Sequence, residues 1–173
     1  MNDYKDIIRE DYNRWGEMNI HNFRSIMFVR MKRWCEKWKY NKAVYMLLWI
    51  AYKHFQIKYG CDIPVQVKIG KGFRIEHLNG IVINPYSEIG NKCTILNGVL
   101  LGNERRGKRK GTPKIGNNVY IGSFATIVGN VKIGDDVLIA PGTFINFDVP
   151  SHSVVFGNPG IIKHRDNATD GYI

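Results

Sequence analysis

From Ile63 onward an isoleucine or leucine recurs every six residues, and this period constrains the fold more than any other feature. An amphipathic helix repeats every 3.6 residues and a half-buried strand every two, so neither produces this pattern. A triangular parallel β-helix does, because each hexad forms one flat side and one corner, and three hexads complete a coil. The hexads read IPVQVK, IGKGFR, IEHLNG, then INPYSE, IGNKCT, ILNGVL, then IGNNVY, IGSFAT, IVGNVK, IGDDVL, IAPGTF, INFDVP.

A small or β-branched residue commonly follows each opening aliphatic by four places, where it fits a tight corner. The opening aliphatics are expected to point inward and to stack from one coil to the next. Repeats of this kind cannot bury a core singly, so several must stack. Twelve complete hexads predict four coils, and the corner residues are Val67, Ser87, Cys93, Val99, Val119, Ala125, Val131, Val137, Thr143 and Val149.

Residues 1–60 lack proline and are predicted to form an α-helical cap on a β-helix domain at 61–156, followed by a tail at 157–173. Ile7, Ile8, Tyr12 and Trp15 fit one helical stripe. Asn22 is a candidate cap for a second helix, and residues 43–58 fit a third helix that ends before Gly60.

The cap also alternates tryptophan with lysine at Trp34, Lys37, Trp38 and Lys39. This pattern is compatible with a helix on a membrane surface, so peripheral membrane association stays open. Helices packed on one another and on the next domain are the simpler interpretation.

The composition bounds the class of protein. A chain of 173 residues suits one domain with a small appendage, and its net charge of +10 favours anionic partners. Three scattered cysteines without CxxC spacing argue against a disulfide framework or a zinc site. The longest apolar run, residues 43–52, is too short to span a membrane, and the N-terminus resembles no signal peptide. We therefore expect a cytoplasmic protein without a metal.

Two departures from the period are informative. One is a two-residue slip between the openers Ile75 and Ile83. The other is the break at 103–114, NERRGKRKGTPK, in which six basic residues face one glutamate. A loop that leaves a rigid solenoid is a common place for binding. A solvated, mobile loop without a role is the alternative.

At this point the chain resembles the serine acetyltransferase branch of the hexapeptide acyltransferases. The segments that carry the resemblance are DIPVQVKIGKGFRIEHLNGIVI, ILNGVLLGN, TPKIGNNVYIGSFATIVGNVKIGDDVLIAPG and VPSHSVVFGNPG. The resemblance implies a left-handed β-helix, a homotrimer, and acetyl-CoA bound in clefts between adjacent copies. Gly102, Ser123, Ala140 and Lys163 are candidate contacts of acetyl-CoA, with the backbone near Gly102 available to an oxyanion.

The resemblance places the catalytic histidine at His77 and its aspartate partner at Asp62. Their separation is nearly one coil, so the carboxylate can lie near the ring on the adjoining layer. A carboxylate on one imidazole nitrogen would fix the tautomer, and the other nitrogen could then take a proton from an acceptor hydroxyl. Asn97 falls one coil after His77 once the slip is subtracted, and it is a candidate for orienting a substrate. A corner asparagine that bonds its own backbone is the alternative.

The positions that hold serine in this family differ here. The family carries RHPKI before the resumed repeat, whereas this chain carries Gly111 and Thr112, and Glu76 replaces an aspartate before the histidine. Because the lost arginine is a natural carboxylate clamp, we expect a sugar hydroxyl as acceptor, in capsular or exopolysaccharide biosynthesis. Glu76, Asn97 and Thr112 are candidate substrate contacts, and Arg105 and Arg106 suit an anionic sugar.

Several alternatives remain. Serine O-acetylation would need another acid, such as Glu17, for the ammonium group. N-acetylation of an amino sugar could use the same base. A non-catalytic trimeric binding module would need neither Asp62 nor His77. Nucleic-acid binding is disfavoured because the basic run lacks interleaved aromatic residues.

Overall fold

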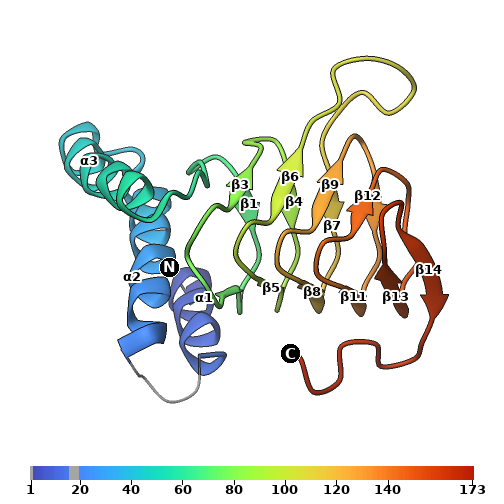
Figure 1. Ribbon diagram of the computed structural model, residues 1–173. Coiled ribbons are helices and arrows are strands. Elements are labelled where there is room, and N and C mark those ends of the chain that lie inside the picture. Colours follow the sequence, from blue (N-terminus) through green and yellow to red (C-terminus); the bar gives the residue numbers. More distant parts are fainter. Residues whose placement is uncertain (1, 16–19) are drawn as a thin grey trace.

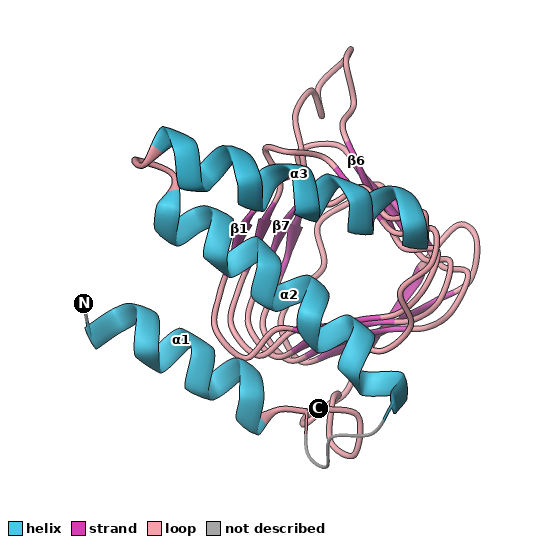
Figure 2. Ribbon diagram, turned by 90° about the vertical axis from the view of Figure 1, so that its left-hand side faces the viewer, coloured by secondary structure: helices cyan, strands magenta, loops and turns pink. Residues whose placement is uncertain are grey.

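The structure of the protein is a computed structural model that describes residues 2–15 and 20–173 (Figure 1). Three helices, α1 (Asn2–Asn13), α2 (Ile20–Trp38) and α3 (Lys42–Tyr59), lie across one end of a β-helix (Figure 2). The side chain of Asn41 caps α3 by accepting from the N–H of Val44, and Gly60 ends the helix with φ 61°. The predicted cap at Asn22 is wrong, because Asn22 lies inside the first turn of α2.

Twelve short strands form three parallel sheets, which are the sides of a triangular β-helix of four coils. The first sheet contains β1 (Lys68–Ile69), β4 (Glu88–Ile89), β7 (Lys114–Ile115) and β10 (Lys132–Ile133). The second contains β2 (Arg74–Ile75), β5 (Thr94–Ile95), β8 (Val119–Ile121) and β11 (Val137–Ile139). The third contains β3 (Val82–Ile83), β6 (Leu100–Gly102), β9 (Thr126–Val128) and β12 (Phe144–Ile145). At the far end, β13 (Ser153–Phe156) pairs with β11, and β14 (Ile161–His164) folds back antiparallel on β13.

The register stacks the opening aliphatics as the period predicts. Ile75 pairs with Ile95, Ile95 with Ile121, and Ile121 with Ile139, and all four are fully buried. The small corner residues are buried as well, from Val67 to Val149. Parallel strands buried in this way form one continuous core, so the predicted fold class is confirmed.

The helices also close the open edge of the first coil, whose carbonyl groups have no preceding coil to pair with. Lys32 Nζ donates to the carbonyl of Val67 at 2.9 Å, and Arg33 Nη1 donates to the carbonyl of Ile69 at 2.8 Å. From α3, the hydroxyl of Tyr52 donates to the carbonyl of Ile63 at 2.7 Å. The cap therefore satisfies backbone groups that burial would otherwise leave unpaired.

Candidate active site

The corner that holds His77 is the only one of its column that carries extra residues. Ile75 pairs with Ile95 and Val82 pairs with Leu100, so this corner is two residues longer than the one above it. In the next two coils the corresponding corners keep the shorter length. The predicted slip is thus present, and its extra residues surround His77, whose side chain is exposed.

His77 lines a cavity of about 190 Å³ between this corner and the helical cap. Arg24 and Ser25 of α2 and Tyr59 of α3 form its cap side. The rest of the lining is contributed by the corner itself: Glu76, His77, Leu78 and Asn79. The volume is below the roughly 300–1,000 Å³ of pockets for drug-sized ligands, so the site suits a small acceptor.

The cavity combines three kinds of charged or titratable group. Glu76 is half-buried and its Oε1 lies 3.1 Å from Arg74 Nη2, which holds the carboxylate in place. Arg24 has no ion pair or side-chain hydrogen bond with any residue that the structure describes. An imidazole, a carboxylate and an uncommitted guanidinium therefore face one small space.

Asp62 precedes the first coil. Asp62 and His77 are both among the described residues, and no hydrogen bond or ion pair joins their side chains. The backbone of Asp62 pairs with β3 through Val82, and its exposed carboxylate lies 3.9 Å from Lys53 Nζ. Val82, on which Asp62 stacks, lies five residues after His77, so Asp62 does not stack on His77 itself. The pairing of Asp62 with the imidazole remains a prediction from the resemblance.

Asn97, Ser123 and Ala140 follow the His77 corner along the β-helix axis, one coil at a time. The N–H of Gly98 donates to the carbonyl of Asn79 at 2.8 Å, which joins the first two coils at this corner. Ser123 Oγ donates to Asn97 Oδ1 at 2.9 Å, and the N–H of Gly142 donates to the carbonyl of Ser123 at 2.8 Å. One predicted substrate contact and two predicted acetyl-CoA contacts therefore share a column with the cavity.

Gly102 and the basic loop lie on another corner, between the third and first sheets. The loop leaves the β-helix after β6 as a short hairpin, in which Glu104 and Gly111 exchange two backbone hydrogen bonds of 3.0 Å (Figure 1). Arg105 and Arg106 at its tip are exposed, whereas Thr112 donates to the carbonyl of Tyr86 at 3.0 Å. In one chain these residues do not line the His77 cavity.

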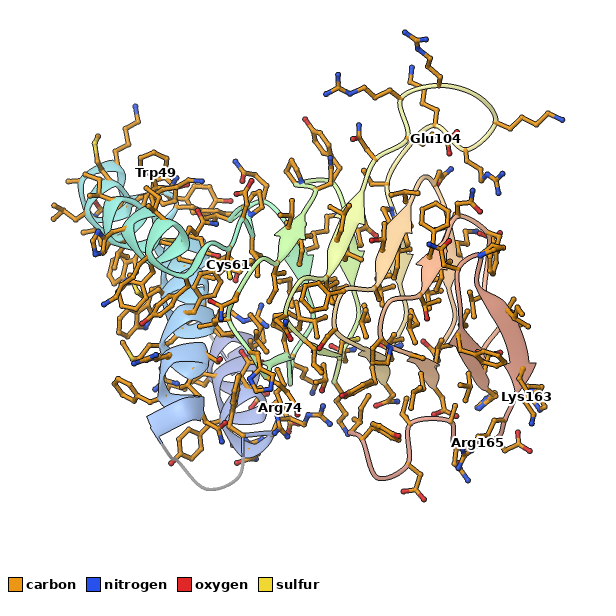
Figure 3. The ribbon with its side chains drawn as sticks, viewed as in Figure 1. Trp49, Cys61, Arg74, Glu104, Lys163 and Arg165 are labelled. Atoms are coloured by element: carbon orange, nitrogen blue, oxygen red, sulfur yellow. The ribbon has the colours of Figure 1, made fainter. Side chains whose placement is uncertain are left out.

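Lys163 is another predicted contact that does not line the His77 cavity. It lies on β14 with an exposed side chain, and Figure 3 shows Lys163 and Arg165 at the opposite end of the β-helix from Trp49 of α3. The single chain therefore does not bring Lys163 to the cavity.

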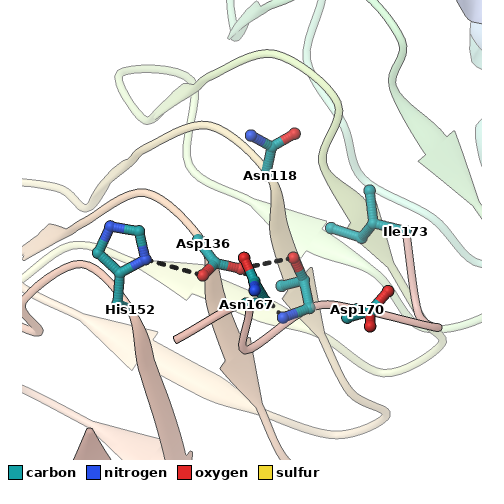
Figure 4. A pocket seen from close by; sticks show the side chains of 7 residues that line it. Asn118, Asp136, His152, Asn167, Asp170 and Ile173 are labelled. Atoms are coloured by element: carbon teal, nitrogen blue, oxygen red, sulfur yellow. Dashed lines mark hydrogen bonds and ion pairs between the residues drawn. The ribbon is translucent and has the colours of Figure 1, made fainter. Parts of the chain in front are cut away.

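A second cavity, of about 530 Å³, lies beside the C-terminal tail and contains Asp136 (Figure 4). Burial alone would raise the pKa of this carboxyl. Hydrogen bonds from the hydroxyl and N–H of Thr169, from His152 and from the N–H of Ala168 outweigh burial and lower the pKa to about 2. Asp136 thus fastens the tail to the β-helix, and its hydrogen-bonding capacity is used up by that role.

The cysteines offer no nucleophile. Cys35, Cys61 and Cys93 are buried and unpaired, and burial raises the pKa of Cys35 to about 11 and that of Cys93 to about 12. Among the described residues, no three histidine, cysteine or acidic side chains are grouped to hold a metal ion. Glu17, which a serine acceptor was expected to need, lies outside the described residues.

Sequence reasoning missed the contribution of the cap to the cavity. Arg24 and Ser25 lie on a helix far from His77 in sequence, and Tyr59 belongs to α3, outside the repeat, so the hexad spacing connects none of them with His77. The sequence does contain one signal. The arginine that the family carries before the resumed repeat is replaced by Gly111, so another arginine of the chain would have to take its role.

Known proteins agree with this architecture. Residues 112–146 match the protein family described as "Bacterial transferase hexapeptide (six repeats)". Serine acetyltransferase 4 of Arabidopsis thaliana is 42% identical over 112 residues, which are 62% of this chain and 32% of the relative. The serine acetyltransferase of Staphylococcus aureus is 39% identical over 112 residues, which are 65% of this chain and 53% of the relative. The chain thus spans about a third to a half of the length of these relatives.

Solved structures extend the likeness to the helical cap. Soybean serine acetyltransferase complexed with serine has a TM-score of 0.79 and 26% identity, covering 94% of this chain and 70% of that one. Serine acetyltransferase from Brucella abortus has a TM-score of 0.81 and covers 97% of this chain and 72% of that one. At 23% identity, the latter bears on the fold alone.

These relatives contradict the expectation of a sugar acceptor in polysaccharide biosynthesis. That expectation was wrong: it rested on the arginine that is missing at Gly111 and Thr112, whereas Arg24 of α2 supplies a guanidinium to the His77 cavity. The chain has a left-handed β-helix fold, its residues 112–146 match the bacterial hexapeptide transferases, and serine acetyltransferases are relatives in sequence and fold.

Proposed function

We propose that the protein is an acetyl-CoA-dependent serine O-acetyltransferase. The observation that carries the proposal is the cavity in which Arg24, Glu76 and His77 meet. A free serine presents a carboxylate, an ammonium group and a hydroxyl, and each of these has a complementary partner among the three side chains. The known relatives, which are serine acetyltransferases, support the same acceptor.

In this mechanism His77 is the general base. Its imidazole takes the proton from the serine hydroxyl as the oxygen attacks the thioester carbonyl of acetyl-CoA. The tetrahedral intermediate then collapses, the carbon–sulfur bond breaks, and the imidazolium returns the proton to the thiolate of CoA. The products are O-acetylserine and CoA. Asp62 is retained as the proposed positioning residue for the imidazole, on the strength of the resemblance.

Arg24 has a separate role, as the clamp for the serine carboxylate. A charge-assisted bond from a guanidinium to a carboxylate contributes about 1.5–3 kcal/mol. Glu76 complements the ammonium group, and Arg74 Nη2, 3.1 Å from Glu76 Oε1, holds this carboxylate in place. The three groups would thereby present the hydroxyl to His77 in one orientation, which is the main advantage of a closed site.

The homotrimer belongs to the proposal as well. Within one chain, Asn97 and Ser123 follow the His77 corner, whereas Gly102 and the basic loop occupy another corner. A neighbouring copy would let one chain's loop complete the other's cleft, as the family resemblance implies. The positive charge of Arg105 and Arg106 suits the phosphates of CoA in that arrangement.

The test measures acetyl-CoA consumption with L-serine, with L-serine methyl ester, and with neutral and acidic glycans. We expect turnover with L-serine, and a rise in its KM of roughly 10- to 100-fold in Arg24→Gln. The methyl ester lacks the carboxylate, so its KM should be nearly the same in both proteins. Arg9→Gln, which removes an exposed charge on α1, is the matched control and should leave all KM values unchanged.

Turnover with a glycan and none with L-serine would overturn the proposed function. If Arg24→Gln loses activity equally with L-serine and with the ester, Arg24 does not bind the carboxylate, but the assignment of serine as the acceptor stands.

A further inference from the structure

The outer side of the helical cap exposes large apolar side chains. Leu47 is 72% exposed, Ile50 is 55% exposed and Ile57 is 81% exposed, all on α3. We call this surface the cap face, and its members are Trp34, Trp38, Met46, Leu47, Ile50 and Ile57. Exposed apolar groups of this density mark an interaction surface more often than chance exposure.

Helix geometry places these residues away from the β-helix. On α3, Met46, Ile50 and Ile57 share one stripe, while the buried Tyr52 and Gln56 face the first coil from the other side. On α2, Trp34 and Trp38 likewise lie opposite Lys32, which is buried against the first coil. The two helices lie side by side across the end of the β-helix (Figure 2), so their outer stripes form one surface.

An apolar hollow of about 300 Å³ adjoins the cap face. Tyr45, Met46 and Trp49 form its walls, and Lys39 and Lys42 stand at its rim. An acyl chain with an anionic headgroup has this combination of chemistry, because its tail is apolar and its phosphate pairs with ammonium groups.

The charge of the cap is strongly one-sided. Residues 20–59 contain nine lysines and arginines and one acidic residue, Glu36. Glu36 is already engaged by Lys32 and Arg33, the latter at 3.5 Å. Basic residues near an anionic bilayer contribute about 1 kcal/mol each, so this surface suits such a partner.

The same charge disfavours a second copy of the chain on the cap face. A symmetric contact would bring the lysines of both copies together, and α3 has no acidic residue to pair with them. No helix among the described residues is long and apolar enough to cross a membrane. A surface-bound mode remains, in which the apolar stripe enters the headgroup region and the lysines stay at its edge.

We propose that the cap face docks the protein on an anionic lipid bilayer. Tryptophans and aliphatic side chains of α2 and α3 enter the interface, and Lys39 and Lys42 pair with lipid phosphates. The proposal does not depend on the acceptor of the acetyl group, since its test measures binding alone.

The experiment is co-sedimentation of the full chain with vesicles of phosphatidylcholine, with or without phosphatidylglycerol. We expect binding only when phosphatidylglycerol is present, and release by high salt. Leu47→Gln/Ile50→Gln/Ile57→Gln should lose binding, whereas Ile161→Gln/Ile162→Gln, at exposed positions on β14, should keep it. Lys39→Gln/Lys42→Gln should weaken binding roughly tenfold or more, and Arg105→Gln/Arg106→Gln, with the same change in net charge, should not.

Three results would overturn the proposal. The first is no binding to phosphatidylglycerol vesicles by a folded wild-type protein. The second is an equal loss in the two charge variants, which would reduce the effect to net charge. The third is a smaller oligomer for the triple glutamine variant by light scattering without lipid, which would assign the cap face to contacts between copies.

Discussion

Ser123 donates a hydrogen bond from its hydroxyl to Oδ1 of Asn97 at 2.9 Å, and this bond ties the second coil to the third directly above the His77 corner. With Oδ1 occupied, the amide nitrogen of Asn97 is the atom left to donate to a ligand. The pair therefore fixes the orientation of a donor in the column that leads from the cavity.

We predict that Ser123→Ala lowers kcat/KM for acetyl transfer by roughly 3- to 10-fold, because an ordinary side-chain hydrogen bond contributes about 0.5–1.5 kcal/mol. Asn97→Ala should have a larger effect, and the double variant should be no worse than Asn97→Ala alone. Steady-state kinetics with both substrates measures this. Additive losses would mean that Ser123 acts independently of Asn97.

The central mechanistic prediction concerns His77. Its replacement by alanine should lower kcat by roughly 10²- to 10⁴-fold, since a general base contributes about that much. Its side chain is exposed, so folding and CoA binding should be preserved, as circular dichroism and calorimetry would show. Wild-type turnover in His77→Ala would remove the general-base role.

Asp62→Asn separates a positioning role from a structural one. The change preserves shape but removes the charge that would stabilise the imidazolium, so the expected loss is smaller than in His77→Ala. The pH profile of kcat/KM should shift if Asp62 acts on His77, because the two groups would then titrate together. An unchanged profile with lower thermal stability would leave Asp62 with the role seen here, next to Val82 and Lys53.

The β-helix was predictable because its signal is periodic. The isoleucines that open the hexads, from Ile75 to Ile139, obey one local rule, inward and stacked, so a single misjudged residue could not hide the pattern. The two departures from the period were equally visible, and one of them marks the corner of His77. The proposed general base therefore lies where the repeat is broken.

The cavity could not be predicted in the same way. Arg24 reaches it from a helix whose position depends on long-range contacts, such as that of Arg33 with the carbonyl of Ile69. Periodicity says that α2 is a helix but not which way its polar side chains face across the end of the β-helix. The proposed carboxylate clamp depends on that placement, and the sequence alone therefore favoured a sugar acceptor, which the relatives contradict.

Those long-range contacts give a prediction for stability. Arg33 is buried, its Nε lies 3.0 Å from Asp11 Oδ2, and it also donates to the carbonyls of Ile69 and Gly70. Arg33→Met would leave a buried carboxylate uncompensated, which costs about 3–5 kcal/mol. Urea unfolding followed by circular dichroism should show this loss of free energy, whereas Arg9→Met at an exposed ion pair should change it by less than about 1 kcal/mol.

The C-terminal tail gives a prediction for pH. Because hydrogen bonds hold the pKa of Asp136 at about 2, below its ordinary value of 3.8, the ionised form stabilises the docked tail. That stabilisation is fully present above the ordinary value and is lost as the pH falls from about 4 through about 2. NMR spectra of the Ala168 and Thr169 methyl groups should stay constant from neutral pH to about pH 4 and change below it.

The variant that tests this tail contact is Asp136→Asn. Its amide can accept fewer of the hydrogen bonds from Thr169, Ala168 and His152, so we expect hydrogen exchange in residues 166–173 to accelerate by roughly tenfold or more at neutral pH. Asp166→Asn removes a charge in the same segment, at a side chain that is 84% exposed, and should leave exchange unchanged. Equal acceleration in both variants would show that net charge, and not the Asp136 contact, holds the tail.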